Sequence, residues 1–172
     1  PDADRVGIAV LHDGAYELLT GNEVGVLLID YIAKRLSERG EDLSEKLVVT
    51  TIVSTLMPDA QAAYYGFELR RVLTGFKYIG GQIALLGQNE ADRFMFGFEE
   101  SYGYMSGTYV RDKDAISASM LICEMAQMYK NEGIDLVEAI ESLYERYGYY
   151  LNKTINMSYP GSSGAAKMEA IM

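Results

Sequence analysis

The sequence is short of several residue types that carry distinctive chemistry. It has one cysteine, Cys123, one histidine, His12, and no tryptophan, so an intrachain disulfide is excluded. Cys123 lies in an apolar helical stretch, where we expect a buried core thiol rather than a nucleophile. His12 lies in a turn, and no serine or cysteine forms an evident dyad with it. We therefore expect a surface turn residue rather than a catalytic base.

Positive charge is also scarce, with 15 Lys and Arg against 25 Asp and Glu and a net charge of −10. This balance argues against a continuous phosphate-binding face for nucleic acid. It leaves room for a small sugar phosphate, because a few placed cations or a metal ion decide such binding locally. No apolar run approaches the roughly 18 residues of a membrane span, and nothing resembles a signal peptide. We expect no membrane contact and a cytoplasmic protein.

The 172 residues are 49% hydrophobic, which is enough to bury a core without disulfides. The sequence begins with Pro1 rather than Met, and residues 167–172 look like the opening of a helix that is cut short. We therefore expect a piece of a larger protein. The composition shift over 148–164 is the strongest domain boundary, and a weaker one lies around 13–20.

Two hydrophobic periods alternate along the chain, one typical of strands and one typical of helices. Asn22, Pro58, Asp114 and Asp135 each stand where a helix is expected to begin. The predicted strands are 6–10, 16–19, 47–52, 68–73, 93–98 and 151–157, the predicted helices are 22–39, 58–66, 76–86, 114–129 and 135–147, and 160–164 is a predicted loop. This order predicts an α/β fold, a layered sheet with flanking helices.

Acidic and basic side chains cluster at the start of the chain, in Asp2-Ala3-Asp4-Arg5. Two carboxylates at this spacing can bind one hard cation, and Mg²⁺ favours such ligands together with a substrate phosphate. The adjacent arginine can hold a phosphate oxygen. The motif is short and lacks a third ligand, so a solvated acidic loop is the competing interpretation.

A predicted strand runs into a glycine-bracketed loop, Gly97-Phe98-Glu99-Glu100-Ser101-Tyr102-Gly103-Tyr104. Ligands of α/β sheets bind beyond the carboxyl ends of the strands. Glu99 and Ser101, two residues apart, can jointly bond neighbouring hydroxyls of a sugar, and the glycines allow tight bends. An ordinary surface turn fits the same residues.

Two further segments precede predicted helices. Arg111-Asp112-Lys113-Asp114 places two cations beside a helix N-terminus, which suits an anion, although a solvated cap with Asp114 as the capping residue is favoured when the segment is read in isolation. Thr74-Gly75-Phe76-Lys77 offers backbone amides and a hydroxyl between a strand and a helix. An ordinary strand–helix turn is the alternative there.

Taken together and in this order, the four segments resemble the α-D-phosphohexomutase superfamily of phosphoglucomutases and phosphomannomutases. The similarity is strongest to the branch with bacterial phosphoglucomutases and the phosphoglucomutase-2/phosphopentomutase group. The resemblance implies four domains, of which residues 1–16 form the end of the second, 17–147 the sugar-binding third, and 148–172 a linker and the start of the fourth. The remaining domains of the parent chain would then complete the site.

The resemblance also implies roles for single residues. Asp2 and Asp4 match two of three Mg²⁺ ligands, the first aspartate of that loop having no counterpart here. Arg5 matches an arginine beside the phosphoserine of the family, and Lys113 a catalytic basic residue near the transferring phosphate.

Substrate contacts are implied for the other loops. Glu99 and Ser101 match the pair that bonds sugar hydroxyls, Thr74 and Gly75 match a second loop facing the sugar, and Arg111 joins the basic site. The implied reaction moves phosphate between the 1- and 6-positions of a hexose through a phosphoserine and a bisphosphate, with glucose 1,6-bisphosphate as activator. Since the serine loop is absent, we expect the isolated chain to be inactive.

Alternatives to a phosphohexomutase stay open on the residues alone. Phosphopentomutase and glucose-1,6-bisphosphate synthase share the loop motif. A metal-dependent phosphatase built on the Asp2 and Asp4 loop, or a carbohydrate-binding module without catalysis, belongs to another class.

Overall fold

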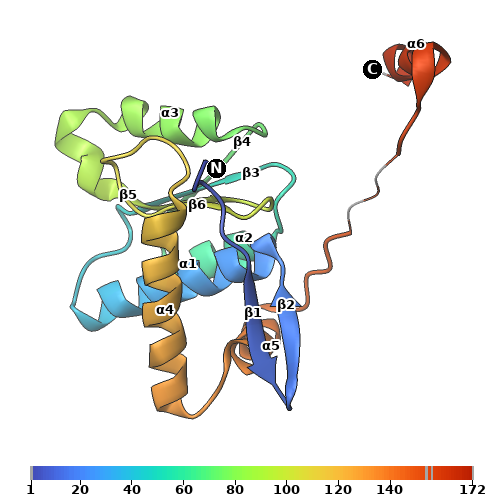
Figure 1. Ribbon diagram of the computed structural model, residues 1–172. Coiled ribbons are helices and arrows are strands. Elements are labelled where there is room, and N and C mark those ends of the chain that lie inside the picture. Colours follow the sequence, from blue (N-terminus) through green and yellow to red (C-terminus); the bar gives the residue numbers. More distant parts are fainter. Residues whose placement is uncertain (1, 154, 156, 172) are drawn as a thin grey trace.

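The computed structural model describes residues 2–153, 155 and 157–171, and only the backbone at 88 and 89. Helices and strands alternate along most of the chain (Figure 1). The elements are β1 (Ile8–His12), β2 (Ala15–Leu19), α1 (Gly21–Glu38), β3 (Leu47–Thr51), α2 (Met57–Tyr65), β4 (Glu68–Val72), α3 (Phe76–Leu86), the 3₁₀ helix η1 (Gln88–Arg93), β5 (Phe94–Glu99), β6 (Gly103–Met105), α4 (Ala115–Glu132), α5 (Leu136–Tyr147) and α6 (Gly161–Ile171).

Four strands form the central sheet, in the order β4-β3-β5-β6. Strand β3 is parallel to both β4 and β5, and the short β6 is antiparallel to β5. Helix α3 covers one face, and α1 and α2 lie on the other, with α4 and α5 beside α1 (Figure 1). This confirms the predicted α/β fold with helices flanking a layered sheet.

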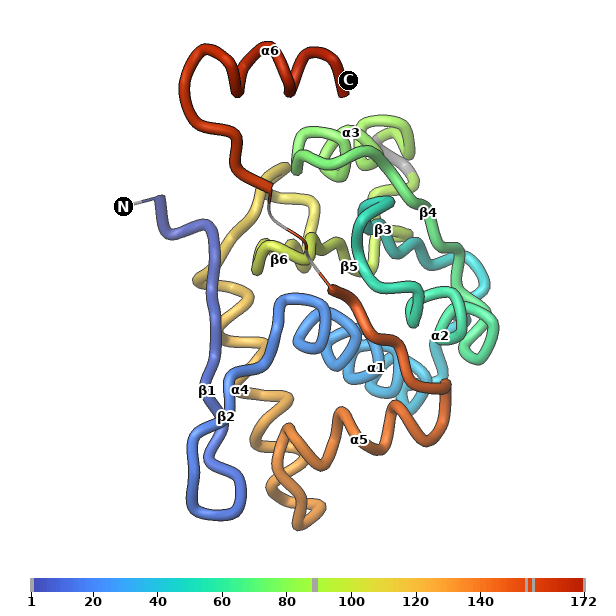
Figure 2. The backbone as a smooth tube through the Cα atoms, turned by 90° about the vertical axis from the view of Figure 1, so that its right-hand side faces the viewer, coloured from blue at the N-terminus to red at the C-terminus, as the bar shows by residue number. Residues whose placement is uncertain are grey.

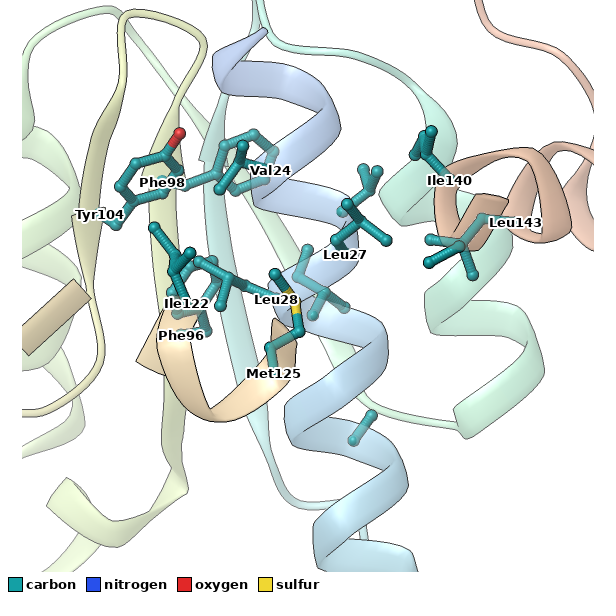
Figure 3. Close-up of a cluster of buried hydrophobic side chains, with 14 of the residues drawn as sticks. Val24, Leu27, Leu28, Phe96, Phe98, Tyr104, Ile122, Met125, Ile140 and Leu143 are labelled. Carbon is teal, nitrogen blue, oxygen red and sulfur yellow. The ribbon is translucent and has the colours of Figure 1, made fainter. Parts of the chain in front are cut away.

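Each face of the sheet has its own hydrophobic core, because side chains of a strand alternate between faces. On the α3 side, Leu47 and Val49 of β3 pack with Ile79 and Ile83. The larger core lies on the α1 side (Figure 3), where α1 is held between the sheet and helices α4 and α5. Its labelled members are Val24, Leu27, Leu28, Phe96, Phe98, Tyr104, Ile122, Met125, Ile140 and Leu143.

The hairpin of β1 and β2 forms a separate two-stranded sheet. Ile8 and Val10 pack against the larger core, while Leu11 and Leu18 are exposed. His12 ends β1 rather than standing in the turn, and its Nδ1 lies 2.8 Å from Oδ2 of Asp135. The expectation of a surface turn residue was therefore wrong in its position, because His12 closes β1 beside the turn and contacts the start of α5.

Two further expectations about single residues were wrong. Thr20 rather than Asn22 caps α1, since its hydroxyl accepts the Glu23 amide while the Glu23 carboxylate accepts the Thr20 amide. The Asn22 side chain instead accepts the Thr55 amide. Cys123 is exposed, because it follows the buried Ile122 and so falls on the outer face of α4.

The C-terminal part also differs from the prediction. Residues 151–153, 155 and 157 form no strand, and residues 154 and 156 of that predicted strand lie outside the described residues. The predicted loop at 160–164 is largely the first turn of α6, in which only Gly164 is buried. Figures 1 and 2 show α6 outside the layered body. In the described part of the chain, no helix combines the length and apolarity needed to span a bilayer.

Candidate functional site

The parallel strands bring three loops to one edge of the sheet. Strands β3, β4 and β5 share a direction, so the segments that follow Thr51, Val72 and Glu99 all leave at the carboxyl edge. This is the edge at which α/β sheets bind their ligands. The segment before β1 joins them, since Arg5 bridges to Gly103 of β6 and the Val6 amide donates to the Tyr102 carbonyl at 3.2 Å.

The two loops predicted to face a sugar are in direct contact. The amide of Gly75 donates to Oε1 of Glu99 over 2.8 Å, and Glu99 is only 7% exposed. Gly75 has φ of 114°, a conformation that glycine adopts readily, and it directly precedes α3. The hydrogen bond therefore fixes one carboxylate oxygen of Glu99 at the start of that helix.

The two predicted charged segments also meet. Nζ of Lys113 lies 3.3 Å from Oδ2 of Asp4 and 2.9 Å from Oδ1 of Asp112. Arg5 lies at the rim, with its Nε 3.9 Å from the same Asp4 oxygen. The Ala115 amide donates to the Ala3 carbonyl at 3.1 Å, so the N-terminal segment is fastened to the start of α4.

Gly103 and Phe76 join these two halves of the site. Glu99 pairs with Gly103 across β5 and β6, and the Lys113 ammonium lies 5.2 Å from the centre of the Phe76 ring. A Cβ on Gly103 would lie 2.5 Å from Cδ of Lys113. The missing side chain thus leaves room for Lys113, and the sequence analysis, which placed Gly103 and Phe76 in candidate segments, did not predict that either contacts Lys113.

Electrostatics keep the basic end of the site charged. Burial alone would lower the pKa of Lys113, but hydrogen bonds with Asp112 and Asp4 outweigh it and raise the pKa. Hydrogen bonds from Ser117, with further ones from the Ile116 amide, hold the pKa of Asp114 below its usual value. Asp114 is also the N-cap of α4, as the solvated-cap interpretation expected.

Four other predicted residues lie at the same edge without a fixed partner. Among the described side chains, those of Asp2, Thr74, Ser101 and Arg111 make no hydrogen bond or ion pair; Ser101 is partly buried and the other three are exposed. Arg111 is placed by its backbone, since a Cβ on Gly80 of α3 would lie 2.3 Å from the Arg111 carbonyl oxygen.

A metal ion would find an incomplete set of ligands among the described residues. They contain no cluster of three or more His, Cys, Asp or Glu side chains able to hold one. Asp2 and Asp4 offer hard carboxylate oxygens, which suit Mg²⁺, but they supply two residues only. The donor chemistry therefore fits the ion, and further ligands have to come from outside these residues.

One residue of the glycine-bracketed loop was overlooked. Oε2 of Glu100 lies 3.3 Å from Oγ1 of Thr51 and 3.5 Å from Oγ of Ser54. The sequence offered a faint signal, because Thr51 and Ser54 follow a buried strand, but nothing local pairs them with a residue so far along the chain.

Comparison with known proteins shows the family to which the chain is similar. The family described as phosphoglucomutase/phosphomannomutase, alpha/beta/alpha domain III, matches residues 20–147. A phosphoglucomutase of Staphylococcus epidermidis is 37% identical over the whole chain, which covers 31% of that protein, and one of Staphylococcus aureus (strain bovine RF122) is 36% identical and covered to 30%. The chain thus spans about a third of the length of these curated relatives.

Solved structures show the same fold. A structure from Thermus thermophilus described as a phosphomannomutase superposes with a TM-score of 0.65 at 25% identity, covering 86% of this chain and 29% of that one. The Aspergillus fumigatus N-acetylphosphoglucosamine mutase, in complex with GlcNAc-6P and magnesium, has a TM-score of 0.58 at 18% identity, covering 88% and 34%. The chain belongs to the phosphoglucomutase/phosphomannomutase family, and residues 20–147 correspond to its α/β/α domain III.

Proposed function

We propose that this chain is the sugar-recognising part of a phosphohexomutase that moves phosphate between the 1- and 6-positions of a hexose. The parent enzyme would be an intramolecular phosphotransferase of the isomerase class. The hydrogen bond from Gly75 to Glu99 carries the proposal, because it joins the two sugar-facing loops beside Lys113 and Asp4. The family match supports it independently.

The proposed chemistry of the sugar end is hydrogen bonding at two points. One oxygen of Glu99 is occupied by the Gly75 amide, which leaves the other oxygen to accept from a sugar hydroxyl. Ser101, two residues on, would bond the neighbouring hydroxyl, and Thr74 would approach from the facing loop. Bonding of two adjacent hydroxyls allows the sugar to bind in either orientation, which a 1,6-transfer through a bisphosphate requires.

The basic end is proposed to hold the phosphate. Lys113 carries a raised pKa, so it stays an ammonium at neutral pH and can neutralise a phosphoryl oxygen. Arg5 and Arg111 add two exposed cations at the same edge. Phosphoryl transfer depends mainly on positioning and on neutralising charge, which is what these residues would supply.

Asp2 and Asp4 are proposed to hold Mg²⁺ together with ligands from outside this chain. A bound Mg²⁺ would neutralise and polarise the phosphoryl group. Asp4 contacts Lys113 through its carboxylate, so this residue links the proposed metal ligands to the basic end of the site.

The rest of the proposal concerns the parent protein. We assign residues 1–16 to the end of domain two, residues 17–147 to domain three, and residues 148–172 to the linker with the start of domain four. The family match over 20–147 supports the assignment of domain three. Hexose phosphates are the proposed ligands, glucose 1,6-bisphosphate the activator, and the cytoplasm the location. An Aspergillus fumigatus relative with 18% identity was solved in complex with glucose 1,6-bisphosphate.

The test is a kinetic assay of the full-length protein that contains this chain. Glucose 1-phosphate should be converted to glucose 6-phosphate, and Glu99→Ala should lower kcat/KM by roughly a hundredfold, because a buried sugar contact is lost. Glu17→Ala, on the exposed hairpin, is the matched control and should change nothing. The 172-residue chain alone should show no turnover.

Rates on other sugars separate the related activities. Mannose 1-phosphate and ribose 1-phosphate should be compared with glucose 1-phosphate in the same full-length protein. Faster turnover of ribose 1-phosphate would make it a phosphopentomutase, and turnover that survives Glu99→Ala on every sugar would refute the assignment.

A further inference from the structure

The loop between β5 and β6 is tightly bent and needs contacts to hold it. The chain reverses between Glu99, the last residue of β5, and Gly103, the first residue of β6. Tyr102 within it has φ of 67°, a left-handed conformation that residues other than glycine seldom adopt. Such a conformation persists only where the surroundings over-determine it. Glu99 and Ser101 therefore depend on whatever fixes this loop.

The Glu100 side chain supplies one such contact. Its Oε2 lies within hydrogen-bonding distance of the hydroxyls of Thr51 and Ser54, at 3.3 and 3.5 Å. The two hydroxyls lie 2.9 Å apart, and both residues are buried. On the other side, a Cβ on Gly21 would lie 2.2 Å from the Glu100 carbonyl oxygen, so the start of α1 abuts the loop backbone.

The segment that carries these hydroxyls is itself held from two directions. Arg71 of β4 donates from Nη1 to the Thr51 carbonyl at 3.2 Å and from Nη2 to the Thr55 carbonyl at 3.0 Å, and it also pairs with Asp59. The Thr55 amide donates to Oδ1 of Asn22 at 3.0 Å. Backbone groups of the β3–α2 segment are thus fastened to β4 and to α1, so the segment is a firm anchor for Glu100.

The two neighbouring carboxylates of the loop are fastened to different segments. Glu99 accepts from Gly75 in the β4–α3 loop, whereas Glu100 contacts Thr51 and Ser54 in the β3–α2 segment. We infer that Glu100 is a positioning residue, which holds the loop so that Glu99 and Ser101 face the sugar. This inference rests on the proposed function, because it assigns the loop a sugar.

The first test measures the loop in the full-length protein by amide hydrogen exchange. Glu100→Ala should speed exchange at residues 99–103 at least tenfold, since a lost anchor raises local opening. Glu100→Gln keeps an acceptor oxygen for both hydroxyls, and its exchange rates should stay within about threefold of those of the unsubstituted protein. Glu141→Ala, on the exposed face of α5, is the control for a lost carboxylate. Unchanged exchange in Glu100→Ala would overturn the inference.

The second test uses the full-length protein and its KM and kcat on glucose 1-phosphate. A positioning role predicts that Thr51→Val and Ser54→Ala reproduce the Glu100→Ala effect, a rise in KM of roughly tenfold, and that Glu100→Gln largely rescues it. Combining Thr51→Val with Glu100→Ala should add little, because both remove the same contact. Normal KM in Thr51→Val and Ser54→Ala beside a raised KM in Glu100→Ala would overturn the inference in favour of a direct sugar contact.

Failure of the proposed function would look different. If Glu99→Ala leaves the full-length activity intact, the site is not used for sugar, and the assignment of Glu100 to sugar positioning falls with it. If Glu99→Ala abolishes activity while all Glu100 variants keep a normal KM and normal exchange, the proposed function stands and only the inference about Glu100 is refuted.

Discussion

At the scale of single residues, charge partners decide which groups respond to pH. His12 shows this outside the candidate site, where its imidazole pairs with Asp135 at the start of α5. The hydrogen bond to Asp135 is the main reason that its pKa lies above the ordinary value of 6.5, with Asp13 and Glu17 adding smaller effects. The hairpin is thereby coupled to the helix through an ionisable contact.

A raised pKa gives a definite pH dependence of stability. Because the folded chain binds the His12 proton more tightly than the unfolded chain, the contribution is complete below pH 6.5 and is lost as pH rises through the folded pKa. His12→Asn should therefore remove a stability decrease between about pH 6 and pH 8, measured by urea unfolding at both ends. If the unfolding free energy of the unsubstituted protein and of His12→Asn depends on pH in the same way, the pairing of His12 with Asp135 is contradicted.

At the scale of elements, helix starts carry much of the site. Asp114 caps α4 by accepting hydrogen bonds from the Ile116 and Ser117 amides. This cap fixes the backbone directly after Lys113. Asp114→Ala should cost about 1 kcal/mol of unfolding free energy, the usual value of an N-cap. Asp112→Ala removes an ion pair of an exposed carboxylate with Lys113 and a local hydrogen bond from the Lys113 amide, but no helix cap, and should cost less than about 0.5 kcal/mol. Urea denaturation of both variants checks the difference, and equal losses would contradict the capping role.

Two helical glycines should respond to alanine in opposite directions. In α3, Gly81 has open space around a Cβ, so Gly81→Ala should stabilise the chain by up to about 1 kcal/mol through helix propensity. In α1, a Cβ on Gly25 would lie 2.4 Å from the Phe98 ring, so Gly25→Ala should destabilise by about 1–3 kcal/mol. Thermal unfolding of the two variants tests this. Stabilisation by both substitutions would mean that Gly25 of α1 is not packed closely against Phe98 of β5.

Element types followed from local pattern, but the contacts between them did not. Asp135 and Asp114 were predictable as caps because the signal sits beside the helix that each begins. Thr20 was also predictable, since Glu23 three residues on completes a capping box. The contact between Glu100 and Thr51 joins residues 49 positions apart, so only the folded sheet reveals it.

At the scale of the whole molecule, the layered body ends soon after α5. Tyr149 packs edge-on against Tyr144 with ring centres 4.9 Å apart, and Tyr150 packs against the larger core. Beyond them Leu151 is 75% exposed, and α6 buries only Gly164. The boundary predicted over 148–164 stays a prediction, and Tyr150 is the last described residue in this stretch that packs against the larger core.

Truncation measures that boundary. A chain ending at Asn152 should keep its unfolding free energy within about 0.5 kcal/mol, because the described residues beyond Asn152 are exposed apart from Tyr159 and Gly164. A chain ending at Tyr147 also loses the two tyrosines and should be weaker by about 1–2 kcal/mol. Equal stability of the two truncated chains would show that Tyr149 and Tyr150 do not hold the segment down.

The family was recognisable because four short motifs, in this order, resemble those of a known family, and the fold class followed from strands that alternate with helices. What the sequence left open is how the motifs meet. The contact of Lys113 with Asp4 joins residues far apart in the chain, and Lys113 lies so close to Gly103 that a Cβ there would be 2.5 Å from its Cδ.

The most direct test of the central claim is hydrogen exchange of the full-length protein with and without saturating glucose 6-phosphate. The ligand should slow exchange at 74–76, 99–104 and 111–115 together, since these segments form one edge of the sheet. Exchange in the hairpin at 8–19 and in helix α5 should not change, because the ligand does not contact them. Protection that leaves 99–104 unchanged would contradict the account.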